Sequence, residues 1–422
     1  RNSAAARTSS EEARGIAAPM RRIFGRTPAE YVGSSERALA VVLDSKAEEP
    51  KKAKSHEKLE RMLKEMKFIL YGDGDKQVDD KKVTKLIREL RTTELTANLV
   101  MNIEKLGFEV PKSVAKILTY WLHDKQSYSD AIAYFERHRQ LIPHLVNNFE
   151  KEEIALPCSE IVKEALVHPK LLKIAFDTND GEVVYKILDY LKNKDVAFAS
   201  EAYTMLDSII NCRQKDPNIS SDMQKEHQKL VAKWIDANYE KFWKRIHAFL
   251  DPKGSHLIME QMLKLVYQVL KTHRNYNIMM KYINEPENLK IVMKLLRVQN
   301  KKIQVMAFNV FKIFFANPEK NEKIVDILLP NLERIHKFLK LLGEDDDLEG
   351  KFEDDLQVLQ EQLDELKKLQ KTRQKQEEPI SKSLTVPSYL GDSKQGDKEE
   401  VKGTPIGNSN TMETSVPSNQ QV

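Results

Sequence analysis

Residues 291–318, IVMKLLRVQNKKIQVMAFNVFKIFFANP, decide the fold of this chain of 422 residues. In the second half of this stretch, apolar side chains between Ile303 and Phe315 recur three and four residues apart, which is the spacing of one face of an α-helix. Asn317-Pro318 then ends the helix, because proline lacks an amide proton and disfavours helical geometry in the residue before it. Strict two-residue alternation, the pattern of a half-buried strand, does not persist in the sequence. We therefore expect an all-α protein.

The same pattern returns in two windows of equal length, 142–169 and 184–211, which align with 291–318 without gaps. A weaker copy spans 246–273, and the longer spacing before it places an insertion near 214–229. In each strong copy a helix and a short charged break precede a second helix that has a small residue facing its partner, at Cys158, Ser200 and Ala307. Such a helix pair must stack on its neighbours to bury its apolar surface, and the spacing is close to the ~40–47 residues of HEAT and armadillo units. The sequence therefore predicts an armadillo/HEAT-like, right-handed helical-repeat solenoid with a concave, ligand-presenting face.

Charge and cysteine content limit the classes of partner and compartment. Lysine and arginine number 68 against 64 aspartates and glutamates, a formal net charge of +4, so the chain lacks the electropositive footprint of a nucleic-acid-binding protein. Charges interrupt its apolar runs before they reach the ~18 residues that a membrane span needs. Two cysteines, Cys158 and Cys212, are too few for a disulfide framework and suit a reducing compartment. We expect a cytoplasmic protein that binds neither nucleic acid nor membrane.

Composition divides the chain into three parts. Residues 1–19 are rich in alanine, arginine and serine and contain no apolar segment, which disfavours a secretory signal and leaves a transit peptide open. We expect these residues to form a disordered N-terminal extension. The armadillo-like repeats are expected within residues 20–371. Residues 372–422 contain four prolines and four glycines among polar residues, which leaves too little apolar surface to offset the entropy of ordering. We expect this last part to be a disordered polar tail.

The sequence lacks the common catalytic, phosphate-binding and metal-binding motifs. It contains no phosphate-binding glycine motif, no zinc-protease motif and no serine-nucleophile motif. An EF-hand calcium loop that starts at Asp73 needs glycine at its sixth place and glutamate at its twelfth, where this chain has Val78 and Thr84. The ten histidines are scattered without a partner ligand at metal-binding spacing. We expect no enzymatic activity, no cofactor and no metal site.

One helix carries a candidate binding surface. Pro286 opens it, and its buried stripe is expected at Leu289, Val292, Leu295 and Leu296. Lys290, Met293 and Arg297 then fall on a different side at i, i+3 and i+7, so we expect Met293 to be exposed between two cations. A polarizable thioether between cations suits an amphipathic peptide that carries aromatic and acidic residues. The alternative is that Met293 packs against the next repeat, because solenoid helices bury two faces.

A second candidate lies just upstream, at the corner formed by residues 273–276. Asn275 and Tyr276 bring a hydrogen-bonding group and an aromatic ring to the junction of two helices. Corners of this kind often carry function, because loops present side chains on a rigid scaffold. The alternative is that Tyr276 only fills the junction.

Several stretches of the chain resemble one known family. They are similar to the Mo25-like scaffold family, also called calcium-binding protein thirty-nine, at residues 66–72 (MKFILYG), 281–290 (KYINEPENLK), 316–318 (ANP) and 325–329 (VDILL). The resemblance runs from Met20 to about Leu369, and the agreement is densest between residues 275 and 331.

The resemblance implies a non-catalytic armadillo-like scaffold that binds a protein kinase or pseudokinase, of the STRAD or sterile-twenty type, and holds the kinase lobes in an active arrangement. In that family an aromatic-acidic tail peptide of the Trp-Glu-Phe type occupies a C-terminal pocket, and Lys290 and Met293 stand at positions of this kind. Lys112 and Tyr276 match kinase-contacting positions of the family.

Four positions depart from the family pattern, one of them mildly, since Tyr276 stands where the pattern has phenylalanine. Glu260 and His273 stand where the family pattern has arginine, and Val196 stands where it has phenylalanine. Glu260 reverses a charge, which leaves the identity of the partner open. Two alternatives therefore stand beside the kinase scaffold. One is a helical-repeat adaptor for a partner that is not a kinase, and the other is a repeat RNA binder, which would need a ladder of polar and stacking residues that the aligned windows lack.

Overall fold

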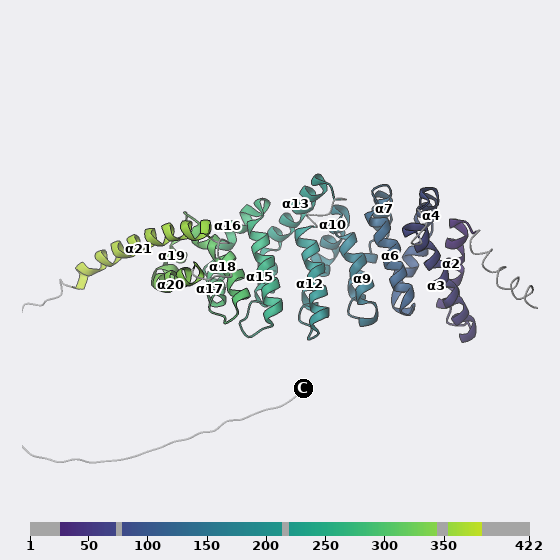
Figure 1. Cartoon of the computed structure of the whole chain (residues 1–422), viewed down its shortest axis with the longest axis horizontal. Helices are drawn as coiled ribbons and strands as arrows, with labels where there is room; N and C mark the ends of the chain where they lie inside the picture. Colours follow the sequence, from purple (N-terminus) through teal and green to yellow (C-terminus); the bar gives the residue numbers. More distant parts are fainter. Residues whose placement is uncertain (1–25, 73–77, 213–218, 344–352, 382–422) are drawn as a thin grey trace, which may run out of the picture. The chain divides into compact units, whose positions relative to one another are not determined.

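The computed structural model describes residues 26–72, 78–212, 219–343 and 353–381 (Figure 1). Throughout these ranges the regular secondary structure is helical, and no strand occurs in them. None of the helices in this part of the chain has an apolar stretch long enough to cross a lipid bilayer. The chain divides into two compact units, Arg1–Lys367 and Lys368–Val422, and the helical repeats belong to the first.

Each repeat of the first unit consists of three helices. Two helices, α2 (Pro28–Leu43) and α3 (Glu49–Tyr71), precede the repeats. The repeats within the described residues are α4 (Asp80–Thr92), α5 (Leu95–Met101) and α6 (Glu109–His123); α7 (Tyr128–Arg137), α8 (Leu141–Asn148) and α9 (Glu152–Ala165); α10 (Pro169–Asp177), α11 (Glu182–Tyr190) and α12 (Val196–Asn211); α13 (Ser221–Ala237), α14 (Tyr239–His247) and α15 (His256–Lys271); and α16 (Tyr276–Asn284), α17 (Pro286–Leu295) and α18 (Lys301–Ala316). They are followed by α19 (Glu322–Leu328), α20 (Leu332–Gly343) and α21 (Glu353–Ser381), and short 3-10 turns lie at η1 (Ile103–Lys105), η2 (Thr178–Gly181), η3 (His273–Asn275) and η4 (Leu329–Asn331).

The third helices of successive repeats pack side by side. Helix α3 contacts α6, and α6, α9, α12, α15 and α18 each contact the next, as the row of ribbons in Figure 1 shows. The first helices α4, α7, α10, α13 and α16 form a second row in the same way. These continuous rows confirm the predicted all-α helical-repeat solenoid, whereas its right-handed sense stays a prediction. The prediction of two helices in each repeat is incomplete. A third helix precedes each predicted pair, as α7 precedes α8 and α9.

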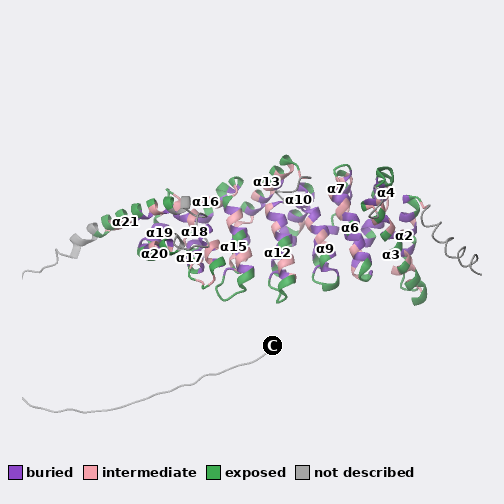
Figure 2. Cartoon of the chain, in the orientation of Figure 1, coloured by how far each residue is buried: buried purple, intermediate pink, exposed green. Residues whose placement is uncertain are grey.

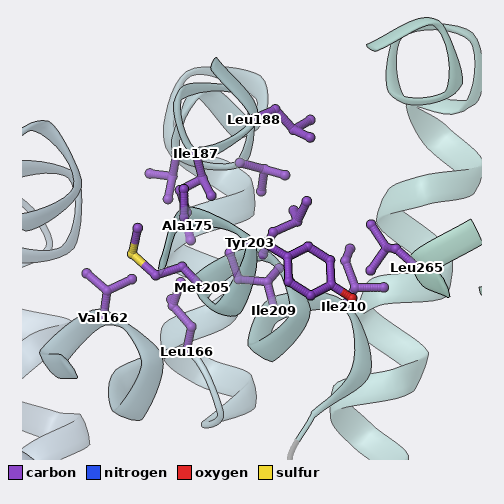
Figure 3. Packing of buried hydrophobic residues seen from close by; sticks show 14 of the residues in the cluster. Val162, Leu166, Ala175, Ile187, Leu188, Tyr203, Met205, Ile209, Ile210 and Leu265 are labelled. Carbon is purple, nitrogen blue, oxygen red and sulfur yellow. The ribbon is translucent and has the colours of Figure 1, made fainter. Parts of the chain in front are cut away.

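One apolar core continues from repeat to repeat. Figure 2 shows that the buried residues gather where helices face one another, and that the turns between helices are exposed. The centre of this core brings together side chains from α9, α10, α11, α12 and α15 (Figure 3): Val162, Leu166, Ala175, Ile187, Leu188, Tyr203, Met205, Ile209, Ile210 and Leu265. Because neighbouring repeats share these contacts, a single repeat cannot bury its apolar surface alone.

Helix α18 shows how the local sequence sets the bounds of an element. Asn300 is its N-cap, and the Asn300 side-chain oxygen accepts a hydrogen bond from the backbone N–H of Ile303 at 3.2 Å. The helix ends at Ala316, immediately before Asn317-Pro318, as the sequence predicts. Its phenylalanines at 311, 314 and 315 are all buried, which confirms the predicted apolar face.

The insertion expected near residues 214–229 falls partly outside the described residues, which omit 213–218. From Ser221 on, the chain forms α13, which has 17 residues where α7 has 10 and α10 has 9. The described part of the insertion therefore lengthens a repeat helix.

The expected terminal segments also lie mostly outside the described residues, which begin at 26 and end at 381. Within the expected tail, residues 372–381 belong to α21, so the start of the tail is helical. The reason is local, because α21 is rich in Glu, Gln, Leu and Lys, which are strong helix formers. In its first half, which belongs to the first unit, Leu359, Leu363 and Leu366 are buried.

Candidate peptide-binding site

A pocket of about 80 Å³ opens between α17, α18 and α20. Its walls are apolar side chains that come from all three helices: Met293, Leu296, Phe311, Ile335 and Phe338. The Phe338 ring lies 6.1 Å from the ring of Phe308, centroid to centroid, so the wall is continuous with the buried core of α18. The volume is well below the ~300 Å³ at which small-molecule sites begin. It suits one apolar side chain of a peptide.

Two guanidinium groups flank this apolar pocket. Arg297 lies just after the end of α17 and Arg334 lies on α20, and both are exposed lining residues. Asn331 in η4 adds an amide to the lining. Arginine offers several planar donors that match a carboxylate, which makes it the residue of choice for an acidic group next to an apolar anchor. The arrangement therefore fits an aromatic side chain beside an acid.

The expectation that Met293 is exposed is wrong. Its exposed fraction is 9%, because α20 covers this side of α17 and places Ile335 and Phe338 beside the thioether. The alternative that Met293 packs against the following element describes its environment better, although the side chain still lines the pocket. The expected buried stripe is otherwise correct, with Leu289, Val292 and Leu295 buried and Leu296 half-buried.

Lys290 lies nearly two turns before Arg297, on the helix face that the spacing predicts for both residues, but it does not line the pocket. Its Nζ forms an ion pair with Glu287 Oε1 at 2.6 Å, and about half of its side chain is exposed. The structure therefore brings Met293 and Arg297 together at the pocket and leaves Lys290 outside its lining.

At the α15–α16 corner, Asn275 and Tyr276 lie in different surroundings. Asn275 is 5% exposed, and its Nδ2 donates a hydrogen bond to the carbonyl oxygen of Val269 at 2.8 Å. This bond holds the corner together and directs the amide into the protein. Tyr276, the first residue of α16, is 58% exposed, so it does not fill the junction and its ring is accessible to a partner.

Lys112 lies on α6 in the first repeat, far along the sequence from the pocket. Its Nζ forms an ion pair with Glu109 Oε1 at 2.9 Å and lies 3.3 Å from the centroid of the exposed Phe108 ring. The six candidate residues therefore belong to three places: the α17 region, the α15–α16 corner and the start of α6.

The positions that depart from the family pattern are all at least partly at the surface. Val196, the first residue of α12, is 59% exposed, and His273 is exposed in η3. Glu260 on α15 is half-buried. Their side chains are therefore at least partly accessible from solvent.

Sequence reasoning missed the side of the pocket that α20 provides. Arg334, Ile335 and Phe338 all lie on this helix. The signal for the helix itself was present, because Leu332, Ile335 and Leu339 fall at i, i+3 and i+7. The contact between α20 and α17 is a tertiary one that spacing within either helix does not show.

Chemically reactive groups are not gathered at this site. Burial raises the pKa of the Cys158 thiol to about 12, so this thiol is protonated in the folded protein. Among the described residues, no three side chains of His, Cys, Asp or Glu come together in a way that could hold a metal ion. Residues 73–77 of the rejected calcium loop lie outside those ranges.

Comparisons with known proteins point to one family. The family model described as Mo25-like matches residues 21–367. Calcium-binding protein 39-like from Mus musculus is 29% identical to this chain over 344 residues, which cover 81% of this chain and 96% of that protein. The Homo sapiens protein of the same name has the same identity and coverage. The Mo25-like protein of Schizosaccharomyces pombe is 28% identical over 317 residues, which cover 75% of this chain and 91% of that protein.

Proposed function

The chain belongs to the Mo25-like family, and from this premise we propose that it is a non-catalytic scaffold that binds and activates a protein kinase or pseudokinase in the cytoplasm. The partner is of the STRAD or sterile-twenty type. One contact is the pocket of α17, α18 and α20, which takes an aromatic-acidic tail peptide. A second contact is made by Lys112 and Tyr276, whose side chains are partly or largely exposed.

The observation that carries this proposal is the chemistry of the pocket. An apolar hollow with room for one side chain lies between Arg297 and Arg334. Burial of an aromatic ring in such a hollow contributes roughly 25 cal/mol per Å² of apolar surface, and a neighbouring carboxylate adds charge-assisted hydrogen bonds to the arginines. A peptide that has an aromatic residue next to an acid satisfies both parts of the site.

Activation without chemistry is a shift of population. A kinase interconverts between open and closed arrangements of its lobes, and a scaffold that binds the closed arrangement more tightly stabilises it by the difference in binding free energy. A stack of helices that shares one core is suited to this role, because a rigid surface can discriminate between two arrangements of its partner. The tail peptide in the pocket would raise the effective concentration of the remaining contacts.

A peptide-binding measurement tests the pocket. A fluorescein-labelled peptide that ends in Trp-Glu-Phe is titrated with the full chain, and its anisotropy is followed. We expect Arg297→Glu combined with Arg334→Glu to weaken binding by tenfold or more, on the order of the ~1.4 kcal/mol or more that two reversed charges remove. Met293→Ala and Lys290→Ala should weaken binding less.

The matched control is Lys294→Glu, which reverses an exposed charge on the same helix outside the pocket lining. It should leave the affinity unchanged within about twofold, since a solvated charge away from the ligand contributes little. Equal affinity of the wild type and the double arginine variant would remove the pocket from the account. Peptide binding without stimulation of any kinase would favour an adaptor for a different partner, which the exposed Val196 and His273 and the half-buried Glu260 would then help to select.

A further inference from the structure

A second cavity, of about 520 Å³, opens at the opposite end of the repeats in the sequence. It lies where α3, α6 and α9 end, and its lining is aromatic and polar: Tyr71, Thr119, Tyr120, His123, Asp124, Lys125, Gln126 and Glu164. Neither the tail-peptide pocket nor the kinase-contacting positions include these residues. The cavity is therefore separate in its residues from both of these sites.

Two tyrosine rings form its aromatic side. Tyr71 is the last residue of α3 and is 52% exposed, yet its hydroxyl donates a hydrogen bond to the carbonyl oxygen of Lys116 at 2.9 Å. Its ring meets Tyr120 edge to face, with 5.3 Å between centroids and 77° between planes. A large ring that is fixed in place but left half-exposed offers contact area at a low cost in conformational entropy.

The polar side of the cavity carries carboxylates. Asp124 follows the end of α6, and its Oδ2 accepts a hydrogen bond from Ser127 Oγ at 2.6 Å, which leaves Oδ1 for a ligand. Glu164 is nearly buried and lies 2.9 Å from His123 Nδ1. Nearby, Lys116 is paired with Glu160 at 3.2 Å, so its charge is largely compensated. Lys125 is the exposed cation of the lining.

Three helix ends add to the negative potential. Helices α3, α6 and α9 contact one another in order, and each places its C-terminal end at this cavity through Tyr71, His123 and Glu164. A helix C-terminus carries about half a negative charge, which favours a cation within the last turn. Burial raises the pKa of Tyr120, and the carboxylates of Asp124 and Asp80 raise it further.

We propose that this cavity binds the guanidinium group of an arginine in a partner protein. The planar cation would lie against the Tyr71 ring and donate hydrogen bonds to the Asp124 carboxylate. Arginine fits better than lysine, because its flat, weakly hydrated head stacks on aromatic faces and matches a carboxylate with two parallel donors. The site does not depend on the tail-peptide pocket, so it would give a partner a separate point of attachment.

The test uses the full chain and the peptide acetyl-Gly-Ser-Arg-Ser-Gly-amide, with binding followed by saturation-transfer NMR over a titration. A matched peptide has citrulline in place of arginine, which keeps the shape and removes the charge. We expect saturable binding of the arginine peptide and at least about tenfold weaker binding of the citrulline peptide, since a charge-assisted hydrogen bond is about twice as strong as a neutral one.

Three variants locate the site. Asp124→Asn keeps a hydrogen-bond acceptor for Ser127 and should weaken the arginine peptide several-fold, and Tyr71→Leu should weaken it about threefold, the low end of a cation–π contact. Lys125→Glu exchanges an exposed residue and should tighten binding, which a misfolded variant cannot do. The Arg297→Glu, Arg334→Glu protein is the control and should bind the arginine peptide as the wild type does. Equal binding of both peptides by the wild type, or indifference of the arginine peptide to Asp124→Asn and Lys125→Glu, would overturn the proposal.

Discussion

Gly181→Ala is expected to destabilise the repeats more than its single added methyl group suggests. Gly181 precedes α11 and has a backbone φ of +81°, in the left-handed region that residues with a Cβ rarely adopt. A Cβ built on Gly181 would lie 2.6 Å from Cζ2 of Trp234, far inside van der Waals contact. The indole cannot move away easily, because it stacks on Phe176 with 4.8 Å between ring centroids and 8° between planes.

The size of the effect follows from these two features. An alanine in the left-handed region costs about 1–2 kcal/mol relative to glycine, and forcing an extra methyl group into a packed site costs about 1–3 kcal/mol more. The lower chain entropy of alanine in the unfolded state offsets about 0.4–1 kcal/mol. The net loss is therefore on the order of 2–4 kcal/mol, located where α10, α11 and α13 meet.

The assay is urea unfolding followed by tryptophan fluorescence and by circular dichroism. Gly33→Ala is the matched control, because Gly33 lies inside α2 and a Cβ there would meet Arg37 Nη1 at 3.5 Å, an ordinary contact. This control should be neutral or stabilise by up to about 1 kcal/mol, the helix-propensity difference between the two residues. A Gly181→Ala protein that unfolds at the wild-type midpoint or later would refute the argument.

Three further predictions concern buried polar groups. Burial lowers the pKa values of His227 and His247 to about 4. The unfolded chain therefore binds more protons than the folded chain between pH ~6.5 and ~4. The free energy of unfolding falls as the pH falls through this window, by up to about 3 kcal/mol for each histidine. Thermal melts of His227→Leu across this range should show a smaller loss than wild type, and an unchanged pH dependence would speak against this assignment. Burial raises the pKa of the Cys158 thiol to about 12, so this thiol should resist iodoacetamide in the native protein near pH ~8 and react after unfolding. Labelling of Cys158 in the native protein, detected by mass spectrometry, would contradict this prediction. Tyr134→Phe should cost about 1–3 kcal/mol in urea unfolding, because the Tyr134 hydroxyl accepts a hydrogen bond from the buried N–H of Ala97 at 2.9 Å; a loss below about 0.5 kcal/mol would contradict this.

The features of the fold that could be predicted from sequence are the local ones. Helix α18 has a capping asparagine, a periodic apolar face and a terminating Asn317-Pro318, and its bounds follow from these signals. The three-helix repeat could not be read in the same way. Its first helices are short in α7 and α10 and long in α13, so they do not align without gaps, and the repeat pattern shows only in the two helices that follow.

In the candidate site, too, the features within one helix could be predicted and the contacts between helices could not. Met293, on α17, and Arg297, just after the end of α17, could be predicted because their spacing in the sequence places them on one side of a helix. The predicted exposure of Met293 was wrong, because α20 covers this side chain. No periodicity within α17 shows that contact. At the corner, the sequence could not distinguish an amide that faces a partner from one that bonds to the backbone, and Asn275 is of the second kind. Arg334, the second cation of the pocket, required the tertiary structure.

Whether this chain is a kinase-activating scaffold can be decided by measuring kinase stimulation with the full chain. The measurement is phosphate transfer by a kinase, or a kinase–pseudokinase complex, whose C-terminal tail carries an aromatic residue beside an acid, with saturating wild-type chain, with Lys294→Glu, and with the Arg297→Glu, Arg334→Glu protein. We expect equal stimulation by the first two proteins and a much higher half-saturating concentration for the third. No stimulation by the wild type, or full stimulation by the double arginine variant at the wild-type concentration, would contradict it.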